Sequence, residues 1–349
     1  MDQDRTTSRR SFLGTAAGAT GVALAAAVWK PTQAAAALPQ QGPAVASPIA
    51  ERSYVSGNFL LTLDGSNAGF LKAIDGGYIT ADVIDQSLGA SGGITKKHIG
   101  SPKYEEFSLQ VGFSMTKAFY DWIAASWNMN YTRHDGSVIL TDFEYVARSA
   151  RNFEDALLTE TGIPACDGSA KEPGYLTVNF QPEFIKYVPG SGETIDFDQR
   201  QQKLWVASNF RLEIDGVDCT RVNKIDAFTI KQGVVTDSLG DARAMQVKPA
   251  APVFPNLKVT FSQVSLPSWM DWFQSFVVQG NNSDAQEKNG RLQLLTPDLG
   301  TTLAEIKFFN IGIFKLEQQS SADTSAIARW AAELYVERME FRYMPPVGT

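Results

Sequence analysis

The chain contains the same strand-and-turn phrase twice, about half its length apart. NFLLTLDG occupies residues 58–65 and NFRLEIDG occupies residues 209–216. In both, apolar residues recur at every second position, as in a half-buried strand, and the phrase ends in Asp-Gly, a strong hairpin signal whose central residues favour positive φ. Two copies of one domain are therefore predicted. The residues of the shared strand face are Phe59, Leu61 and Leu63 in the first copy and Phe210, Leu212 and Ile214 in the second.

The similarity extends beyond this phrase, because the segments that follow each turn come in the same order. Each turn leads to an Ile-Asp pair, a long loop, an alternating strand, a helical segment, a turn, further strands and a closing alternating strand. In the two halves these segments are the Ile-Asp pairs at 74–75 and 225–226, the loops 85–106 and 233–255, SLQVGFS (108–114) and NLKVTFS (256–262), KAFYDWIAASW (117–127) and SWMDWFQSFV (268–277), SVILTD (137–142) and RLQLLT (291–296), and YLTVNFQ (175–181) and AELYVER (332–338).

The two helical segments carry aromatic stripes. Trp269, Trp272, Phe273 and Phe276 recur at the spacing of one helix face, and Phe119, Trp122, Ile123 and Ser126 form a weaker stripe in the first half. This spacing predicts a helix that packs on a sheet, with Trp122 and Trp272 in equivalent buried positions. The alternative is a flat aromatic platform for a sugar or a base.

These patterns predict a mainly β fold of the α+β class, with two tandem β-sandwich or half-barrel domains and one packed helix in each. The Pro-Gly-Ser-Gly sequence at 189–192 marks the joint between the copies. The predicted organisation is a signal peptide at 1–36, a flexible arm at 37–50, a first domain at 51–188, a linker at 189–204 and a second domain at 205–345.

The amino-terminal residues form a twin-arginine export pattern. Arg9 and Arg10 are followed by Phe12 and Leu13, and then by an Ala- and Gly-rich run without charge from 14 to 28. This order of a basic region, a weakly apolar region and small residues is that of an export signal, and the run is too short for a comfortable membrane span. Translocation in the folded state to the periplasm or the exterior is therefore expected.

Composition narrows the classes of partner. The formal charge is −7, and residues 1–36 hold four basic and two acidic side chains, so removing their net +2 leaves the rest near −9. An acidic chain is a poor match for nucleic acid, and no later apolar run is long enough to span a membrane. The only cysteines are Cys166 and Cys219. Folding in the reducing cytoplasm before export favours free thiols, with a single bridge as the alternative.

Motifs for catalysis are missing from the sequence. It contains neither a nucleophile elbow nor a phosphate-binding or dinucleotide-binding glycine motif, and its two histidines are His98 and His134, both in expected loops or turns. Glycines at 89, 92 and 93 suit a mobile loop better than an anion cradle. The basic run at 96–98 suits a subunit contact or solubility better than phosphate binding. We predict no catalytic, cofactor-binding or metal-ligating residues and therefore no enzyme.

Several motifs occur in the same order in both halves. They are LTLDG (61–65), KKHIGSPKYEEFSLQVGFS (96–114), YDW (120–122), HDGSVILTD (134–142) and YLTVNFQ (175–181), followed by EIDG (213–216), NLKVTFS (256–262), MDW (270–272), NGRLQLL (289–295) and ELYVERMEF (333–341). In this order they resemble the tail-tube proteins of contractile phages and related injection systems, whose fold is shared with the type VI secretion tube protein. Two features depart from the family pattern. Members of the family are usually single-domain and cytoplasmic. The second half also has APVFPN (251–256) where the family pattern has a loop with glycine and lysine.

The resemblance implies a structural subunit that forms rings or tubes. Six single-domain copies close a ring in that family, so two domains per chain imply a homotrimer with pseudo-sixfold symmetry that either stacks or stays a single ring. Other tail-like or envelope proteins are the further partners that it implies. Two alternatives stay open from the sequence: an exported, envelope-associated ligand-binding protein on the same fold, and an exported hydrolase without a motif.

Overall fold

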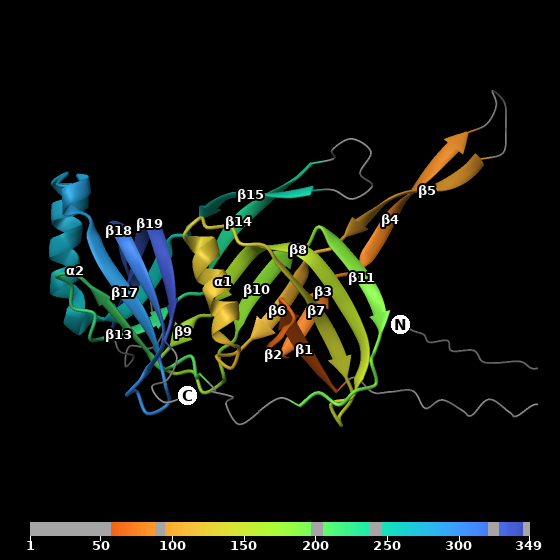
Figure 1. The fold of residues 1–349 in the computed structure, drawn as a ribbon. Helices are drawn as coiled ribbons and strands as arrows, with labels where there is room; N and C mark the ends of the chain where they lie inside the picture. Colours follow the sequence, from red (N-terminus) through yellow and green to blue (C-terminus); the bar gives the residue numbers. More distant parts are fainter. Residues whose placement is uncertain (1–56, 88–94, 197–204, 238–245, 320–327, 345–349) are drawn as a thin grey trace, which may run out of the picture. The chain divides into compact units, whose positions relative to one another are not determined.

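The computed structural model describes residues 57–87, 95–196, 205–237, 246–319 and 328–344 (Figure 1). All of them belong to one compact unit, Ser53–Thr349. Apolar alternation produces strands along most of this length. The first half contains β1 (Asn58–Leu63), β2 (Ser66–Leu71), β3 (Ala73–Gly76), β4 (Ile79–Ser87), β5 (Thr95–Tyr104), β6 (Phe107–Val111), α1 (Lys117–Trp127), β7 (His134–Thr141), β8 (Ala147–Ile163), β9 (Cys166–Asp167), β10 (Leu176–Gln181) and β11 (Phe184–Pro189).

The second half repeats most of this order and closes with a single long strand. It contains β12 (Phe210–Ile214), β13 (Val222–Ile225), β14 (Phe228–Asp237), β15 (Gln246–Val253), β16 (Leu257–Ser262), the 3₁₀ turn η2 (Gln263–Ser265), α2 (Leu266–Phe273), the π-helical turn η3 (Gln274–Val278), the 3₁₀ turn η4 (Asp284–Gln286), β17 (Lys288–Leu295), β18 (Thr302–Gln319) and β19 (Arg329–Tyr343). The fold is mainly β, with one α-helix packed in each half, as predicted.

The two halves have the same antiparallel topology. The first half orders its strands β2-β1-β7-β8-β10-β6-β3, and the second orders them β12-β17-β18-β19-β16-β13 before β9 of the first half. β12 therefore corresponds to β1, β17 to β7 and β18 to β8. The single long strand β19 corresponds to β10 and β11 together, because both of these pair with β8.

The match extends to individual residues. Phe59 lies opposite Leu140 in the first half, and Phe210 lies opposite Leu294 in the second. Both long strands also carry a bulge where a non-glycine residue has positive φ: Asp155 in β8 (52°) and Asn310 in β18 (56°). A strained backbone position kept at the same place in both copies shows that the copies share their register as well as their order.

The two segments expected as dissimilar loops are β-hairpins in the structure. β4 pairs with β5, and β14 pairs with β15, with a register shift at the same point in each: between Ala81 and Val83, and between Gln232 and Val234. The prediction of loops at 85–106 and 233–255 was therefore wrong for residues 85–87, 95–104, 233–237 and 246–253, which the structure describes as strands. Exposed strands of mixed polarity lack the alternation that marks a half-buried strand. The two histidines, expected in loops or turns, are also in strands: His98 lies in β5, and His134 is the first residue of β7.

The sequence alignment of the strand before α1 (β6) with the strand before α2 (β16) was wrong by two residues. Ile74 pairs with Leu109 and its counterpart Ile225 pairs with Val259, so Leu109 corresponds to Val259 and not to Leu257. A shift of two residues keeps every side chain on its face, so alternation alone could not detect it.

The two Asp-Gly turns differ. Asp64 and Gly65 both have positive φ, and this turn joins β1 to β2 in a hairpin. At the second turn only Gly216 has positive φ, and Ile214 and Val217 form a single bridge. The second half therefore has no equivalent of β2 among the described residues.

The side chains expected in the core occupy both strand and helix positions. Trp122 of α1 and Trp272 of α2 are both buried, and Trp122 packs against the rings of His134 and Phe180. Phe59 and Phe210, at the beginnings of their strands, are half-buried. The remaining buried members are Leu61, Leu63, Leu212 and Ile214.

The two thiols are unpaired, and the amino-terminal export pattern lies outside the described residues. Cys166 and Cys219 are free thiols, and burial raises the pKa of each to about 12. Arg9, Arg10, Phe12 and Leu13 lie outside the described residues. Within the described part of the chain, no helix is long and apolar enough to cross a membrane.

Candidate assembly interface

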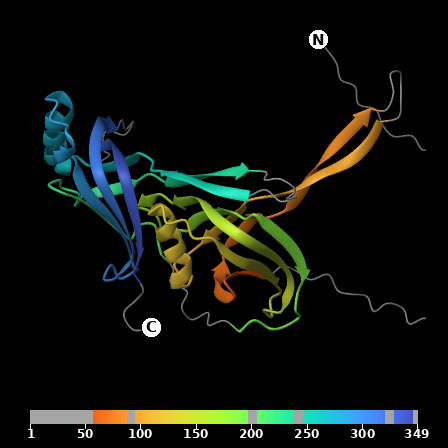
Figure 2. The same cartoon turned by 45° about the horizontal axis from the view of Figure 1, so that its top comes forward.

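The two halves are joined by continuous strand pairing. The end of β8 pairs with the start of β14, with Thr161 opposite Ile230 and Glu160 opposite Lys231, and β9 pairs with β13 just beyond. The hairpin β14–β15 of the second half thus extends the sheet of the first half, as the two views in Figures 1 and 2 show.

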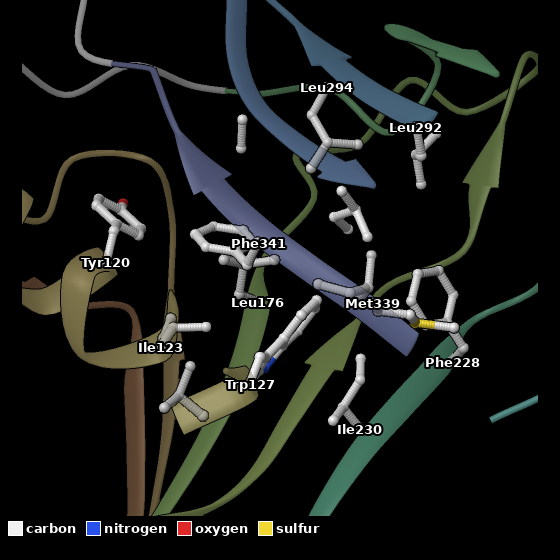
Figure 3. Packing of buried hydrophobic residues seen from close by; sticks show 14 of the residues in the cluster. Tyr120, Ile123, Trp127, Leu176, Phe228, Ile230, Leu292, Leu294, Met339 and Phe341 are labelled. Carbon is white, nitrogen blue, oxygen red and sulfur yellow. The ribbon is translucent and has the colours of Figure 1, made fainter. Parts of the chain in front are cut away.

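Helix α1 contributes the apolar part of this joint. Its Trp122 packs within the first half, while Tyr120 and Trp127 face β19 of the second half. The ring of Tyr120 stacks on Tyr343 at 4.1 Å between centroids. The ring of Trp127 lies 5.6 Å from that of Phe341, and Figure 3 shows these two side chains next to each other. Tyr120 and Trp127 are no more than 2% exposed, so α1 is buried on both sides.

Buried polar contacts fix the hairpin β14–β15 against the first half. The Ser126 hydroxyl on α1 donates to the Gln232 side-chain oxygen on β14, and both side chains are buried. Further along, Val247 of β15 donates its N–H to the Glu183 carboxylate at 2.8 Å and accepts from Arg133 through its carbonyl. Arg133 and Glu183 also pair with each other at 2.6 Å. The joint therefore combines strand pairing, apolar packing and directional hydrogen bonds.

The joint uses the end of β8 and β9 from the first half and β13 and β14 from the second half. The equivalent strand edges on the other half of the chain have no such partner among the described strands. In the first half β3 pairs only with β6 and β4 only with β5, so the edge that corresponds to β13–β14 is free among the described strands. In the second half, residues 315–318 of β18 pair with β19 alone, although their counterparts in β8 also pair with β14. A heterologous contact with two unused ends is the kind that repeats from copy to copy.

The sheet face that α1 covers in the second half is open in the first half. We call this surface the open face and define it by Phe59, Val138, Leu140, Tyr187 and Pro189, which line a cavity of about 640 Å³. Tyr187 is 50% exposed, whereas its counterpart Phe341, in contact with α1, is 3% exposed. Their equivalence follows from the strand partners, because Tyr187 lies opposite Arg151 and Phe341 lies opposite the matching residue Ile306.

Helix α2 has an outer surface on which apolar side chains are largely exposed among the described residues. Its Trp269 stacks on Phe261 and its Trp272 is buried, so this side packs within its own half. The outer face of α2 and η3, defined by Met270, Phe273, Val277 and Val278, corresponds to the side of α1 that carries Tyr120, Ile123 and Trp127. Met270 is 37% exposed, Val277 41% and Val278 62%, while Phe273 is half-buried.

Outside the joint and the two apolar faces, the described residues show a histidine–aspartate pair and a second cavity. No group of three His, Cys, Asp or Glu side chains suitable for a metal occurs among them. His134 pairs with Asp64 at 2.6 Å and thereby connects β7 to the first hairpin turn. A second cavity of about 730 Å³ surrounds the Asp215–Gly216 turn and is lined by both polar and apolar side chains. The glycines at 89, 92 and 93 lie outside the described residues.

The sequence interpretation missed the residues that make the joint. Tyr120 and Trp127 lie seven residues apart beside the predicted stripe of α1, and this second aromatic stripe signals a helix buried on two sides. Gln232, Arg133 and Glu183 gave no such signal, because single polar residues outside an apolar stripe are ordinary surface residues.

No protein-family model matches the sequence, and no curated protein sequence matches it. Several solved structures are similar to part of the chain. A tube-terminating cap protein of the anti-feeding prophage is 21% identical over 42% of this chain and 98% of its own, with a TM-score of 0.37. A chain of the PVC extracellular contractile injection system sheath–tube complex is 17% identical over 40% of this chain and 94% of its own, with a TM-score of 0.35. Hcp1 from Flavobacterium johnsoniae is 10% identical over 39% and 95%, with a TM-score of 0.24.

Proposed function

We propose that the chain is a structural subunit that associates head to tail with further copies of itself into a ring. The observation that carries this proposal is the joint between the halves, which pairs the edge of one half with a different edge of the other. The counterpart edges, at β4 and at the end of β18, pair with no further strand among the described residues. Exposed strand edges and apolar faces favour association with other chains unless they are covered.

The proposed ring contains three chains. Each chain supplies two equivalent halves, so three chains provide six halves arranged with pseudo-sixfold symmetry. A heterologous contact closes into a ring when its rotation divides a full turn, and otherwise produces an open filament. Joints within the chain and joints between chains alternate around this ring. The resemblance of both halves to tail-tube proteins supports a place for the ring in a phage-tail-like or injection-system-like assembly, with tail-like or envelope proteins as further partners.

Light scattering and electron microscopy of the purified chain test the proposal. The expected result is a trimer or a polymer of trimers at tens of micromolar, with rings visible in micrographs. A strictly monomeric chain with no rings would refute it. A monomer that retains a small molecule in native mass spectrometry would support the alternative ligand-binding protein, for which the cavity at the open face is the candidate site. Turnover of an ester, peptide or glycoside would support the hydrolase.

We also propose that the chain crosses the cytoplasmic membrane in the folded state, to the periplasm or the exterior. The support is the arginine pair Arg9 and Arg10 with Phe12, Leu13 and the uncharged run that follows. Replacing both arginines by lysine keeps the charge but removes the pattern. The double variant is expected to accumulate at full length in the cytoplasm, as followed by cell fractionation. Normal export of the variant would refute the proposal.

A further inference from the structure

We infer that the contact between copies repeats the joint within the chain, residue for residue. The outer face of α2 packs on the open face of the next copy, and the end of β18 pairs with the start of β4. This inference rests on the proposed function and identifies the surfaces of association. Its basis is internal: the joint within the chain shows what covers each of these surfaces in the other half.

The strand register follows from the pairs already present. In the joint, Glu160 lies opposite Lys231 and Thr161 lies opposite Ile230. Their counterparts place Lys315 opposite Thr80 and Leu316 opposite Ile79 of the next copy. In the single chain the Ile79 N–H donates to the Tyr187 hydroxyl at 2.8 Å. A side chain thus caps the edge donor, and the carbonyl of an incoming strand would take over that hydrogen bond.

The apolar surfaces correspond in the same way. Within the chain, Tyr120 stacks on Tyr343 and Trp127 packs on Phe341. The counterparts of these pairs are Met270 with Pro189 and Val277 with Tyr187. Both members of each pair are apolar or aromatic and at least one is exposed in the single chain, so their contact removes apolar surface from water. The occupant of the open face is therefore a second copy of this chain.

Charges at the far end of the contact are complementary. Within the chain, Arg133 and Glu183 hold the backbone of Val247. In the contact between copies the corresponding positions are Glu287 and Glu337 on one side and Lys97 on the other. Lys97 and Glu337 are exposed, and Glu287 accepts from the Tyr335 hydroxyl at 2.7 Å. A lysine opposite two carboxylates favours this register over one that places like charges together.

A disulfide between copies tests the register. The variant carries Thr80→Cys and Lys315→Cys, with Cys219→Ser so that the buried Cys166 is the one native thiol left. Residues directly opposite each other in an antiparallel pair have Cβ atoms about 4.5–5.5 Å apart, which a disulfide can span with a small adjustment. Mild oxidation should give cross-linked dimers and trimers that disappear on reduction. The matched control, Thr80→Cys with Gln318→Cys, is displaced by three residues, about 10 Å along the strand, and should not cross-link.

A second pair of variants tests the helix contact without cysteines. Val277→Glu introduces a charge on the outer face of α2, whereas Val264→Glu makes the same change at a valine that is 75% exposed outside it. Val277→Glu should abolish association at an unchanged melting temperature, and Val264→Glu should leave association intact.

The two proposals fail separately. If the wild-type chain associates but neither the 80–315 cross-link nor the effect of Val277→Glu appears, the ring proposal survives and this interface is wrong. If Val277→Glu lowers the melting temperature of a monomeric chain, the outer face of α2 packs within its own chain, and the inference is overturned. A wild-type chain that never associates overturns both.

Discussion

Helices α1 and α2 occupy the same place in their halves, but within the part of the chain that the structure describes only α1 is covered on both sides. One side of each helix carries buried tryptophan and packs on its own sheet. On the other side, α1 presents Tyr120 and Trp127 to the second half, whereas α2 presents Met270 and Val277 to solvent. One of two equivalent helix surfaces is thus part of the folding core, and the other is the surface that we propose for association between copies.

The side chains on the two helices reflect this difference. Aromatic rings in the joint bury more apolar surface than the Met and Val counterparts would. A contact that folds with the chain is made once and is always present at high effective concentration. A contact between copies pays for lost translational freedom and can be reversible. The less aromatic pair therefore lies at the contact that we propose between copies.

The largest expected effect comes from removing the large side chain in the joint. Trp127→Ala should lower the free energy of unfolding by about 3–5 kcal/mol, because the cavity lies between two halves that cannot both collapse into it. Val277→Ala should change it by no more than ~0.5 kcal/mol in a dilute, unassociated chain. Urea unfolding followed by tryptophan fluorescence measures both. Equal losses would show that the two helices are equally covered and would remove the comparison.

The sequence predicted the fold class well because alternation and the helical stripe report directly on burial. Local periodicity alone was enough to place Leu61 and Leu212 on buried strand faces and Trp122 and Trp272 on the inner faces of the helices, where they are buried. The exposed hairpins gave no such alternation and were misread as loops. The register of β6 against β16 was displaced by two residues, since a period of two cannot distinguish even shifts.

The candidate interface was harder to predict than the fold. The pairing of β8 with β14 is a contact between distant segments, and its strands have the composition of ordinary edges. The stripe of Tyr120 and Trp127 was visible in the sequence, but without a partner surface it could be assigned to either half. Only the matching registers of the two copies connect Tyr187 with Phe341 and thereby identify the open face.

A smaller loss is expected from the buried hydrogen bond across the joint. Gln232→Leu leaves the Ser126 hydroxyl buried without its partner, which should cost about 1–3 kcal/mol. Its counterpart in the first half, Ala81, lies on the exposed hairpin, so Ala81→Gln should be nearly neutral in the unassociated chain. Chemical unfolding curves of the two variants give the values. A neutral Gln232→Leu would indicate that the hairpin β14–β15 is not anchored on α1.

The shared bulges predict a pair of equal effects. Asp155 and Asn310 have positive φ, which a β-branched side chain adopts at a cost of about 1–2 kcal/mol. Both Asn310 variants also lose the hydrogen bond that Asn310 Nδ2 donates to Glu287 at 2.8 Å. The difference between the Val and the matched Gly variant removes this loss and should therefore be similar at the two positions. Thermal or urea unfolding of the four variants gives the two differences. Clearly unequal Val-to-Gly differences would limit the equivalence of the halves to their topology.

The smallest effect concerns a carboxyl group present in one half only. Burial raises the pKa of Glu106 above its ordinary value of 4.5, and the neighbouring Glu160 raises it further, while hydrogen bonds from Thr159 and Asn179 act against this. The corresponding residue of the second half is the neutral Asn256. Because the folded state holds this proton more tightly than the unfolded state, the contribution of Glu106 to stability is fully present below pH 4.5 and is lost as the pH rises through the folded pKa.

Glu106→Gln should therefore gain stability relative to the wild type between pH ~4 and pH ~7, in parallel series of urea midpoints. Glutamine keeps an oxygen that accepts from Thr159, so the comparison isolates the ionisation. The gain should be smaller than the loss from Gln232→Leu, because Glu106 is only partly buried and solvent screens its charge. Asn256→Gln serves as the matched control and should give a difference that does not change with pH. A pH-independent difference for Glu106→Gln as well would show that burial does not perturb this carboxyl group, and the two halves would then be electrostatically equivalent at this position.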